Sequence, residues 1–437
     1  MKSKEMKSQD KIYNFDTLCI HAGQQPDIDT KSIGVPVHRT CSYIYDSVQQ
    51  SADVFSLKEL GNIYTRITNP TQEILEKRIA DLEGACDALA LSSGTAAIYY
   101  SIINFCSVGE EIISSNKISS ATQAIFNSML PQFGINVKYF NPDDPSNLKK
   151  AITKNTRGVF IETISNPTLD FMDIDAIADI AHSYNIPLIV DATFTTPYLL
   201  KTIEYGADIV INSLSKWIGG HGTGIGGAVA DSGKFDWKDP KFKLFNEPDP
   251  SYNGIRYAHD FSQLNSSPFI MRMRHVPLRN IGACISPDNA WIFLQGLETL
   301  HLRMERHCEN SFKAAEFLRN HPKVNWIRYP GLNDDPTYEV AKRYLKRGFG
   351  SVVVLGLKGG NASGERFVNS LKLFSLAAGV GDVKSLALQY PFNTTHLKLT
   401  EQQRKEAGEG NTLVRLSIGI EDINDILSDL NQALRDT

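Results

Sequence analysis

Helical stretches alternate with short apolar segments between Pro70 and Gly227, and this alternation is the feature that most restricts the fold. The apolar segments include GVFIET (158–163), PLIVDA (187–192) and ADIVIN (207–212). Apolar runs this short are typical of strands that are buried on both faces. Such strands separated by helices predict an α/β fold, in which a mostly parallel sheet carries helices on both faces.

The chain has 437 residues, more than one hydrophobic core usually holds, so we expect more than one domain. Residues 1–66 lack regular periodicity and predict an extended N-terminal arm. A large domain is expected over residues 67–297, with a polar, aromatic and proline-rich insertion near 231–279. Residues 298–437 predict a smaller C-terminal α/β domain with an antiparallel sheet, and helical periodicity from Asp288 to about Asn320 predicts one long helix that joins the domains.

One lysine stands between an apolar strand and a glycine-rich turn in the segment GADIVINSLSKWIGGHGTGIGG (206–227). Lys216 is placed where a strand ends and side chains can converge on a ligand. Partial burial would lower the pKa of its amine, which could then attack a carbonyl and form a Schiff base. Ser213 and Ser215 flank the lysine with hydroxyls that suit a phosphate. An aldehyde that carries a phosphate is pyridoxal 5'-phosphate (PLP), so the segment predicts a PLP site; the alternative for a lone lysine is a solvated surface charge.

Three further segments carry candidate contacts to the same cofactor. Asp191 ends an apolar run, and a buried carboxylate there requires a cationic partner such as the protonated pyridine nitrogen of PLP; the alternative is a cap or strand-end aspartate. Gly94 and Thr95 lie in a turn between a predicted strand and an alanine-rich helix, where N–H groups and the helix dipole attract a phosphate. Glu162 and Asn166 follow another strand and either support the cofactor or serve as a turn and a cap.

Arg415 lies in the alternating segment LVRLSIGI (413–420), on the face opposite to its apolar neighbours. A buried guanidinium requires an anion, and its planar fork fits a carboxylate in a bidentate manner. Arg415 is therefore a candidate for binding a substrate carboxylate, and the alternative is a structural salt bridge.

Charge and composition exclude several classes of protein. A net charge of −4 and an isoelectric point near 6.2 give no basic surplus for nucleic acid or an anionic membrane. The 6 cysteines are scattered without a CxxC pair, which indicates reduced thiols and neither disulfides nor a zinc site, and we expect no metal. The first residues, MKSKEMKSQDK, lack the apolar core of a signal peptide, and no apolar run approaches a membrane span. We therefore expect a cytoplasmic protein that acts on small molecules.

Ordered sequence motifs extend over nearly the whole chain. They are HAGQQPD (21–27), YTRITNPT (64–71), RIADLEG (78–84), SSGTAA (92–97), SNPT (165–168), DATFTTPYL (191–199), SLSKWIGGHGTGIGG (213–227), GLETLHLRMERH (296–307), GVGDVKSL (379–386), NTTH (393–396) and VRLSIGIED (414–422). In this order they resemble the Cys/Met-metabolism group of fold-type-I PLP enzymes, and within that group the O-acetylhomoserine sulfhydrylases. Chain length and the segments PDPSYNGIRY (248–257) and GDVKSL favour the sulfhydrylases over the cystathionine enzymes.

The resemblance implies a fold-type-I PLP-dependent transferase with a central sheet of the seven-stranded type. It implies that Lys216 binds PLP covalently and that Arg415 holds the α-carboxylate of the substrate, with Asn393 nearby. It also implies that Tyr64 and Arg66 reach the PLP phosphate of the neighbouring subunit, where Tyr64 meets the substrate as well. The expected assembly is a homodimer with shared active sites, further assembled as a homotetramer.

The implied reaction is a γ-replacement on an O-activated homoserine. Sulfide or a thiol would replace the acetate of O-acetylhomoserine and give homocysteine or a homologue, as in methionine biosynthesis. Three alternatives stay open: a γ-lyase, a specialised γ-replacement with another nucleophile, and a PLP-binding protein without turnover.

Three positions depart from the family pattern. Ser119 stands where the family has a tyrosine that stacks on the PLP ring, and Ala192 stands where an asparagine bonds the phenolic oxygen of PLP. Asn393 replaces a serine that contacts the cofactor lysine and the substrate. These changes predict a wider pocket over the ring face and turnover of a bulkier partner than sulfide.

Overall fold

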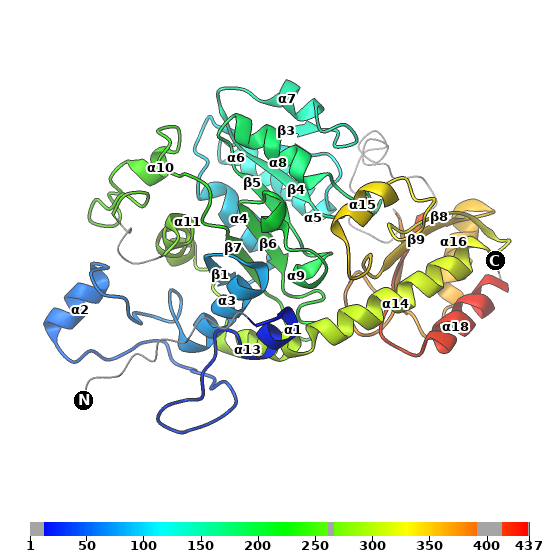
Figure 1. The fold of residues 1–437 in the computed structure, drawn as a ribbon, viewed down its shortest axis with the longest axis horizontal. Coiled ribbons are helices and arrows are strands. Elements are labelled where there is room, and N and C mark those ends of the chain that lie inside the picture. The colour runs from blue at the N-terminus through cyan, green and yellow to red at the C-terminus, as the bar shows by residue number, and fades with distance from the viewer. Residues whose placement is uncertain (1–12, 261–265, 391–412, 436) are drawn as a thin grey trace.

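The computed structural model describes residues 13–260, 266–390, 413–435 and 437. Its centre is a 7-stranded sheet with the order β1-β7-β6-β5-β4-β2-β3 (Figure 1). The strands are β1 (Asp87–Leu91), β2 (Glu111–Ser115), β3 (Asn136–Phe140), β4 (Thr156–Glu162), β5 (Leu188–Asp191), β6 (Ile209–Ser213) and β7 (Gly227–Asp231). Only β7 runs antiparallel to its neighbours β1 and β6, so the predicted mostly parallel sheet is confirmed.

Successive residues of the central strands face opposite sides of the large sheet, which explains the continuous apolar runs in the sequence. Ile189 of β5 packs in a cluster with α4 (Gly94–Ile103), whereas its neighbour Val190 packs in a second cluster with α3 (Pro70–Glu83) and α8 (Ile174–Ser183). Helices therefore cover both faces of the sheet (Figure 1).

The insertion near 231–279 contributes to the core on the α4 side of the sheet. Its Trp237 ring stacks on Phe245, with 4.6 Å between ring centroids, and on Phe269, with 5.0 Å. All three side chains are buried, and they belong to the cluster that contains α4. The short helices α10 (Lys243–Asn246) and α11 (Pro268–Met273) carry Phe245 and Phe269.

A second sheet has 5 strands in the order β10-β11-β12-β9-β8, and only the β10–β11 pair is parallel. The strands are β8 (Val324–Arg328), β9 (Val352–Leu357), β10 (Ser375–Leu376), β11 (Leu386–Tyr390) and β12 (Leu413–Ser417). Val414 and Leu416 of β12 pack in a cluster with α16 (Gly360–Ser370) and α18 (Ile423–Arg435). Arg415 lies between them in sequence and therefore faces the other side, toward the large sheet.

The predicted single long helix is wrong in one respect, because the structure has two helices there. They are α13 (Pro287–Glu298) and α14 (Leu300–Arg319), separated at Thr299, whose φ of −113° and ψ of 9° are not helical. The Arg303 side chain donates from Nε to Thr299 Oγ1 at 3.3 Å, which stabilises the break. The boundaries at 66/67 and 297/298 stay predictions.

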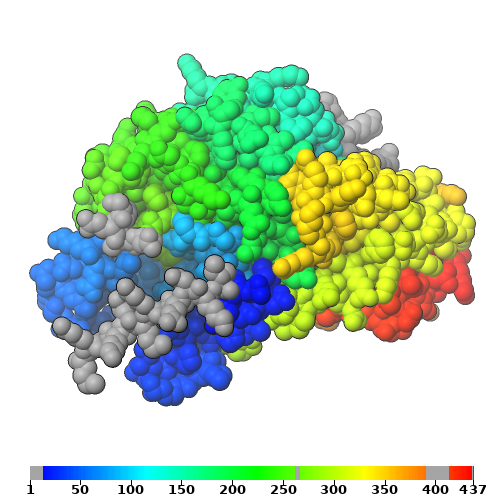
Figure 2. Space-filling model, viewed as in Figure 1, coloured from blue at the N-terminus to red at the C-terminus, as the bar shows by residue number. Residues whose placement is uncertain are grey.

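The N-terminal arm is not wholly irregular. It contains α1 (Phe15–His21), which buries Phe15 and Cys19 against the large domain, and α2 (Val48–Phe55). Figure 2 shows the arm in blue along the lower left of the molecule. Several apolar arm side chains are almost fully exposed in the single chain: Ile28 (78%), Ile33 (86%), Ile44 (98%) and Val48 (89%).

Shorter helices complete the described chain. They are α5 (Ser120–Ala124), α6 (Leu130–Gln132), α7 (Asn147–Ala151), α9 (Thr196–Leu199), α12 (Arg279–Ile281) and α15 (Tyr338–Tyr344), with π-helical turns at Ile125–Met129 and Arg274–Leu278 and a 3₁₀ turn at Thr202–Tyr205. Among the described helices, none combines the length and apolar character needed to cross a bilayer.

Candidate active site

A cavity of about 490 Å³ opens at the carboxyl ends of β4, β5 and β6, with β12 of the small sheet at one side. Side chains at the carboxyl ends of parallel strands converge at one edge of a sheet, which is where α/β proteins usually bind ligands. The sequence-predicted residues that line the cavity are Gly94, Thr95, Ser119, Glu162, Asn166, Asp191, Ser213, Ser215, Lys216 and Arg415.

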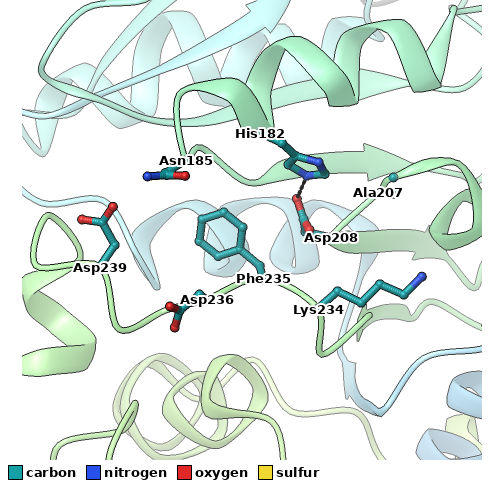
Figure 3. Close-up of a pocket in the computed structure, with 9 residues that line it drawn as sticks. His182, Asn185, Ala207, Asp208, Lys234, Phe235, Asp236 and Asp239 are labelled. Atoms are coloured by element: carbon teal, nitrogen blue, oxygen red, sulfur yellow. Dashed lines mark hydrogen bonds and ion pairs between the residues drawn. The ribbon is translucent and has the colours of Figure 1, made fainter.

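A second cavity, of about 440 Å³, lies at the opposite edge of the large sheet (Figure 3). There His182 and Asp208 point toward one another, with His182 Nε2 2.8 Å from Asp208 Oδ2, and Asp208 also accepts the N–H of Leu188 at 2.8 Å. Lys234 Nζ donates to the carbonyl of Ile203 at 3.4 Å. The polar groups of this cavity bind one another and the sheet backbone. We therefore take the first cavity as the candidate active site, although the two volumes are similar.

Lys216 follows β6 and is held by a glycine-rich turn. Its carbonyl accepts the N–H of Gly220 at 2.7 Å, and Arg303 of α14 donates to the carbonyls of Trp217 (2.6 Å) and Ile218 (3.1 Å). A Cβ atom at Gly220 would lie 2.1 Å from Arg303 Nη1, and the φ of +72° there also favours glycine. The backbone around Lys216 is therefore fixed from both sides.

The environment of Lys216 favours its neutral amine. Burial lowers the pKa of Lys216, and the positive charge of Arg415 lowers it further, while Asp191 acts in the opposite direction. The neutral amine is the form that attacks a carbonyl carbon, so the site is suited to covalent binding of an aldehyde.

Two carboxyl groups lie side by side beneath the cavity. Glu162 ends β4 and Asp191 ends β5, and the two residues are register partners in these parallel strands. Burial raises the pKa of both groups, and the charge of Asp191 further raises the pKa of Glu162. Asp191 Oδ1 accepts the N–H of Thr193 at 2.9 Å. A cationic ring nitrogen over Asp191 would compensate the cost of burying its charge.

The N-terminus of α4 lies against the end of β6. Ser93 Oγ accepts the N–H of Ala96 at 3.1 Å and lies 3.0 Å from Thr95 Oγ1. A Cβ atom on Gly94 would lie 2.7 Å from Ser213 Cβ, so glycine permits the close contact between the turn and the strand. Hydroxyls and N–H groups at the start of a ten-residue helix have the chemistry of a phosphate site.

Arg415 reaches the cavity from the small sheet and is 4% exposed. Its Nη1 donates to Asn166 Oδ1 at 3.0 Å, and its Nη2 donates to the carbonyl of Gly379 at 3.0 Å. The guanidinium places a positive charge in the cavity wall, and its planar fork can bind a carboxylate.

The wall formed by residues 119–122 consists of small side chains. Ser119 caps α5, its N–H donates to Glu162 Oε1 at 2.8 Å, and its Oγ lies 2.9 Å from Thr122 Oγ1. Among the described lining residues, Phe194 supplies the only aromatic ring, which packs on Trp217 with 5.1 Å between centroids.

Some predicted residues lie apart from the cavity lining. Ala192 is fully buried, and its N–H donates to Ile211. In the arm, the Arg66 guanidinium lies 5.0 Å from the centre of the Tyr64 ring, and neither residue lines the cavity of its own chain. Asn393 lies outside the described residues.

Two contributing residues were not found by sequence reasoning. Thr193 accepts the N–H of Ser213 on its Oγ1 at 2.8 Å and so links the ends of β5 and β6. Arg303 fixes the turn after Lys216 through hydrogen bonds to backbone carbonyls. The sequence pattern that could have identified it is its position on the same helix face as Leu300 and His307, which are also buried. Within the described residues, no group of three or more His, Cys, Asp or Glu side chains is placed to hold a metal ion.

Comparison with known proteins agrees with the geometry. The family described as Cys/Met metabolism PLP-dependent enzyme matches residues 16–435. The O-acetyl-L-homoserine sulfhydrylase of Leptospira meyeri is 44% identical over 98% of this chain and 98% of its own length. The homocysteine synthase of Schizosaccharomyces pombe is 45% identical over 96% of this chain and 98% of its own length.

A solved structure from Campylobacter jejuni, assigned as an O-acetylhomoserine (thiol)-lyase, superposes with a TM-score of 0.93 and 37% identity, covering 97% of this chain and 100% of that one. It carries N'-pyridoxyl-lysine-5'-monophosphate, the lysine adduct of the cofactor. Fold, family match and cavity chemistry agree: the chain belongs to the Cys/Met-metabolism family of PLP-dependent enzymes.

Proposed function

We propose that this protein is a PLP-dependent transferase that catalyses γ-replacement on O-acetylhomoserine, with sulfide or a thiol as the nucleophile. The observation that carries the proposal is the placement of partly buried Lys216 and buried Arg415 in one cavity with the carboxyl pair of Glu162 and Asp191. Relatives of 40–45% identity over nearly the full length are named O-acetyl-L-homoserine sulfhydrylase or homocysteine synthase, which supports this reaction over others of the family.

The residues present fit PLP. Lys216 would bind its aldehyde carbon, Asp191 would pair with its ring nitrogen, and Gly94, Thr95 and the Ser213 hydroxyl would hold its phosphate. When bound, PLP supplies an electron sink that makes the Cα and Cβ protons of the substrate acidic.

The chain's own residues would orient the substrate and move its protons. Arg415 would fix the α-carboxylate in the cavity that Lys216 also lines, so the substrate would be held within reach of the lysine. Lys216 would take the Cα proton and then shuttle the Cβ proton, because its lowered pKa keeps the amine available as a base.

A specialised γ-replacement is the second candidate, and one observation favours it. Residues 119–122 have small side chains, so this wall leaves room above the cofactor ring that an aromatic side chain would fill. A nucleophile bulkier than sulfide could enter there. We expect poor homocysteine synthesis from sulfide if this specialisation holds.

We also propose a homodimer with shared active sites, assembled as a homotetramer. The exposed apolar side chains of the arm, among them Ile33 and Ile44, would be covered by a second copy. Tyr64 and Arg66 lie outside the cavity of their own chain, which fits a role in the partner's site.

A mass-spectrometric product screen tests the reaction. The holoenzyme is given O-acetylhomoserine or O-succinylhomoserine with sulfide, cysteine or an amine, and Lys216→Ala serves as the control without a catalytic lysine. From O-acetylhomoserine with sulfide or cysteine, we expect a thiol or thioether product in equal amount to released acetate, and none from Lys216→Ala. Accumulation of 2-oxobutanoate and ammonia would instead identify a γ-lyase, and a complete lack of turnover would identify a PLP-binding protein without activity.

A further inference from the structure

A continuous path of hydroxyl and carboxyl groups leads from the cavity wall to the end of β4. Ser119 Oγ lies 2.9 Å from Thr122 Oγ1, and the Thr122 hydroxyl donates to Glu162 Oε1 at 3.4 Å. Because Thr122 gives its only hydroxyl proton to Glu162, its oxygen accepts the proton of Ser119. The direction of donation therefore runs from Ser119 through Thr122 to Glu162.

The outer member of this path is partly exposed, and the two inner members are buried. Ser119 is partly exposed, whereas Thr122 is 0% exposed and Glu162 is 5% exposed. The outer hydroxyl can therefore touch a ligand in the cavity, while the inner carboxyl is shielded from bulk water. A hydrogen-bonded chain of this kind can pass a proton inward without exposing the acid.

Glu162 is the one ionisable group of the described cavity lining without a role in the reaction outlined above. The others are Asp191 from β5, Lys216 after β6 and Arg415 from β12, and all of them face the same space. Burial and the charge of Asp191 raise the pKa of Glu162, so its carboxylate is a stronger base than an ordinary glutamate. A base of this kind is suited to a thiol, whose own pKa lies near neutrality or above it.

We propose that Ser119, Thr122 and Glu162 form a proton relay that accepts the proton of the incoming nucleophile, an inference that rests on the proposed γ-replacement. Over the whole replacement, a sulfur lone pair forms the bond to Cγ, and the Cγ–O bond breaks with its electron pair leaving on acetate. The S–H proton passes to Ser119 Oγ, the Ser119 proton passes to Thr122 Oγ1, and the Thr122 proton passes to Glu162 Oε1. The carboxylate becomes a carboxylic acid as the acetyl ester becomes acetate, so charge and atoms balance.

In this relay Ser119 is the catalytic residue, because its oxygen meets the nucleophile, and Thr122 and Glu162 act through it. A purely structural role is the competing explanation, since Ser119 caps α5 and its N–H bonds Glu162. The two explanations differ in which step they affect. Loss of the relay would slow only the addition of the nucleophile. Displacement of residues 119–122 would also slow the Cα proton transfer at Lys216.

The test compares two rates in Ser119→Ala and Glu162→Gln holoenzymes. One is kcat/KM for the nucleophile, and the other is deuterium exchange at Cα of the substrate in heavy water, followed by NMR. We expect kcat/KM for the nucleophile to fall by roughly 100-fold, the usual range for lost general base catalysis, while Cα exchange stays within about twofold. The glutamine side chain still has an oxygen that can accept the Ser119 N–H. Glu162→Gln therefore removes the base and preserves the contact that positions residues 119–122.

A matched control is Ser286→Ala. Ser286 also caps a helix, accepting the N–H of Asn289 at 3.1 Å at the start of α13, and it lies outside the cavity lining. We expect both rates of this variant to match those of the unaltered protein. The comparison separates the loss of a helix cap from the loss of the relay.

Infrared titration of the holoenzyme gives a readout apart from activity. We expect the difference spectrum between the unaltered protein and Glu162→Gln to contain one protonated carboxyl band that titrates with pH, and this band to change frequency in Ser119→Ala. Bands from other buried carboxyls, such as Glu83, remain in both variants. Equal slowing of Cα exchange and nucleophile addition, or full activity of Glu162→Gln, would overturn the relay and leave γ-replacement standing. Failure of the unaltered protein to give any replacement product, with Cα exchange retained, would instead refute the proposed function and the relay with it.

Discussion

The positive charge of Arg415 affects the protonation state of Lys216 in the cavity. Arg415 is a buried cation beside Lys216, and its charge favours the neutral form of the lysine. Arg415 is always protonated under ordinary conditions, so Lys216 is the partner that gives up its proton. A substrate carboxylate that binds Arg415 would add a charge-assisted hydrogen bond to the contacts that Arg415 makes with Asn166 and Gly379.

Replacement of Arg415 tests this assignment at the residue scale. We expect Arg415→Ala to raise the KM for the amino-acid substrate by an amount that corresponds to about 2 to 5 kcal/mol, because one partner of a buried charge pair is lost. Bound PLP should be unaffected, since we assign Arg415 to the substrate carboxylate and Gly94 and Thr95 to the phosphate. The measurements are steady-state kinetics and the PLP content of the purified variant.

Arg415→Lys is the matched comparison, because it keeps the charge and removes the planar fork. We expect a KM between those of the alanine variant and the unaltered protein. Loss of PLP from either variant would reassign Arg415 to cofactor binding, and an unchanged KM would indicate a structural role at the contact between the two sheets.

At the element scale, α3 and β6 are joined by a buried contact directly behind the phosphate turn. Asn212 Nδ2 of β6 donates to Glu83 Oε1 at the end of α3 at 2.6 Å, and within the described residues Glu83 Oε2 has no hydrogen-bond partner. Burial raises the pKa of Glu83 to about 7, against opposing effects of Asn212 and Lys201. The neighbouring residue of β6 is Ser213, so the contact supports the cofactor site.

Burial of Glu83 makes stability fall as pH rises, because burial raises its pKa. Between an unfolded pKa near 4.5 and a folded pKa of about 7, folded Glu83 holds more protons than the unfolded chain, so the free energy of unfolding decreases with pH over that window. We expect Glu83→Gln, which stays neutral, to gain about 2 to 3 kcal/mol relative to the unaltered protein between about pH 5 and pH 7. Urea unfolding of both holoproteins at several pH values measures the difference.

Two buried histidines have the opposite effect on the pH dependence of stability. Their contribution is the same in Glu83→Gln and in the unaltered protein, so it cancels when the two are compared. Burial lowers the pKa of His275 and His307 to about 4, so both cost stability as pH falls below their unfolded value near 6.5. Both proteins contain them, which leaves the Glu83 contribution in the difference. A difference that does not vary with pH would show that Glu83 stays ionised in the folded state.

Elements with a strong local pattern could be predicted from the sequence, and contacts between distant segments could not. The strands that end at Asp191 and Ser213 are continuous apolar runs, and Lys216 follows one of them, so all three could be placed at one sheet edge. The break at Thr299 leaves the helical periodicity on either side intact and was missed. The bond from Ser119 to Glu162 spans 43 residues and depends on how two strands lie beside one another.

At the scale of the whole molecule, the arm is the part whose packing is least complete in a single chain. Ile33 and Ile44 are 86% and 98% exposed, although apolar side chains of this size are usually covered. Arg66 has a buried Nε atom for which the described chain offers no acceptor. Both observations fit an arm that packs on a second copy and carries Tyr64 and Arg66 to that copy's cavity.

Complementation between two inactive variants tests whether sites are shared. Arg66→Ala should weaken PLP retention in the partner's site, and Lys216→Ala should inactivate its own site. In a mixed dimer, one site combines the intact Lys216 of one chain with the intact Arg66 of the other, while the second site lacks both. Random mixing of equal amounts should therefore restore about one quarter of the full activity, because about half of the dimers are mixed and each has one intact site.

The matched control replaces another arginine of the same arm. Arg39 is exposed and pairs with Asp288 of its own chain, with 2.6 Å between Nη2 and Oδ1, so Arg39→Ala should retain activity without any mixing. Mixed dimers are verified by mass spectrometry with differently tagged chains, and activity and PLP content are measured on the same sample. If Arg66 served the cavity of its own chain, every mixed dimer would contain only defective sites, and verified mixed dimers without recovered activity would exclude the shared site.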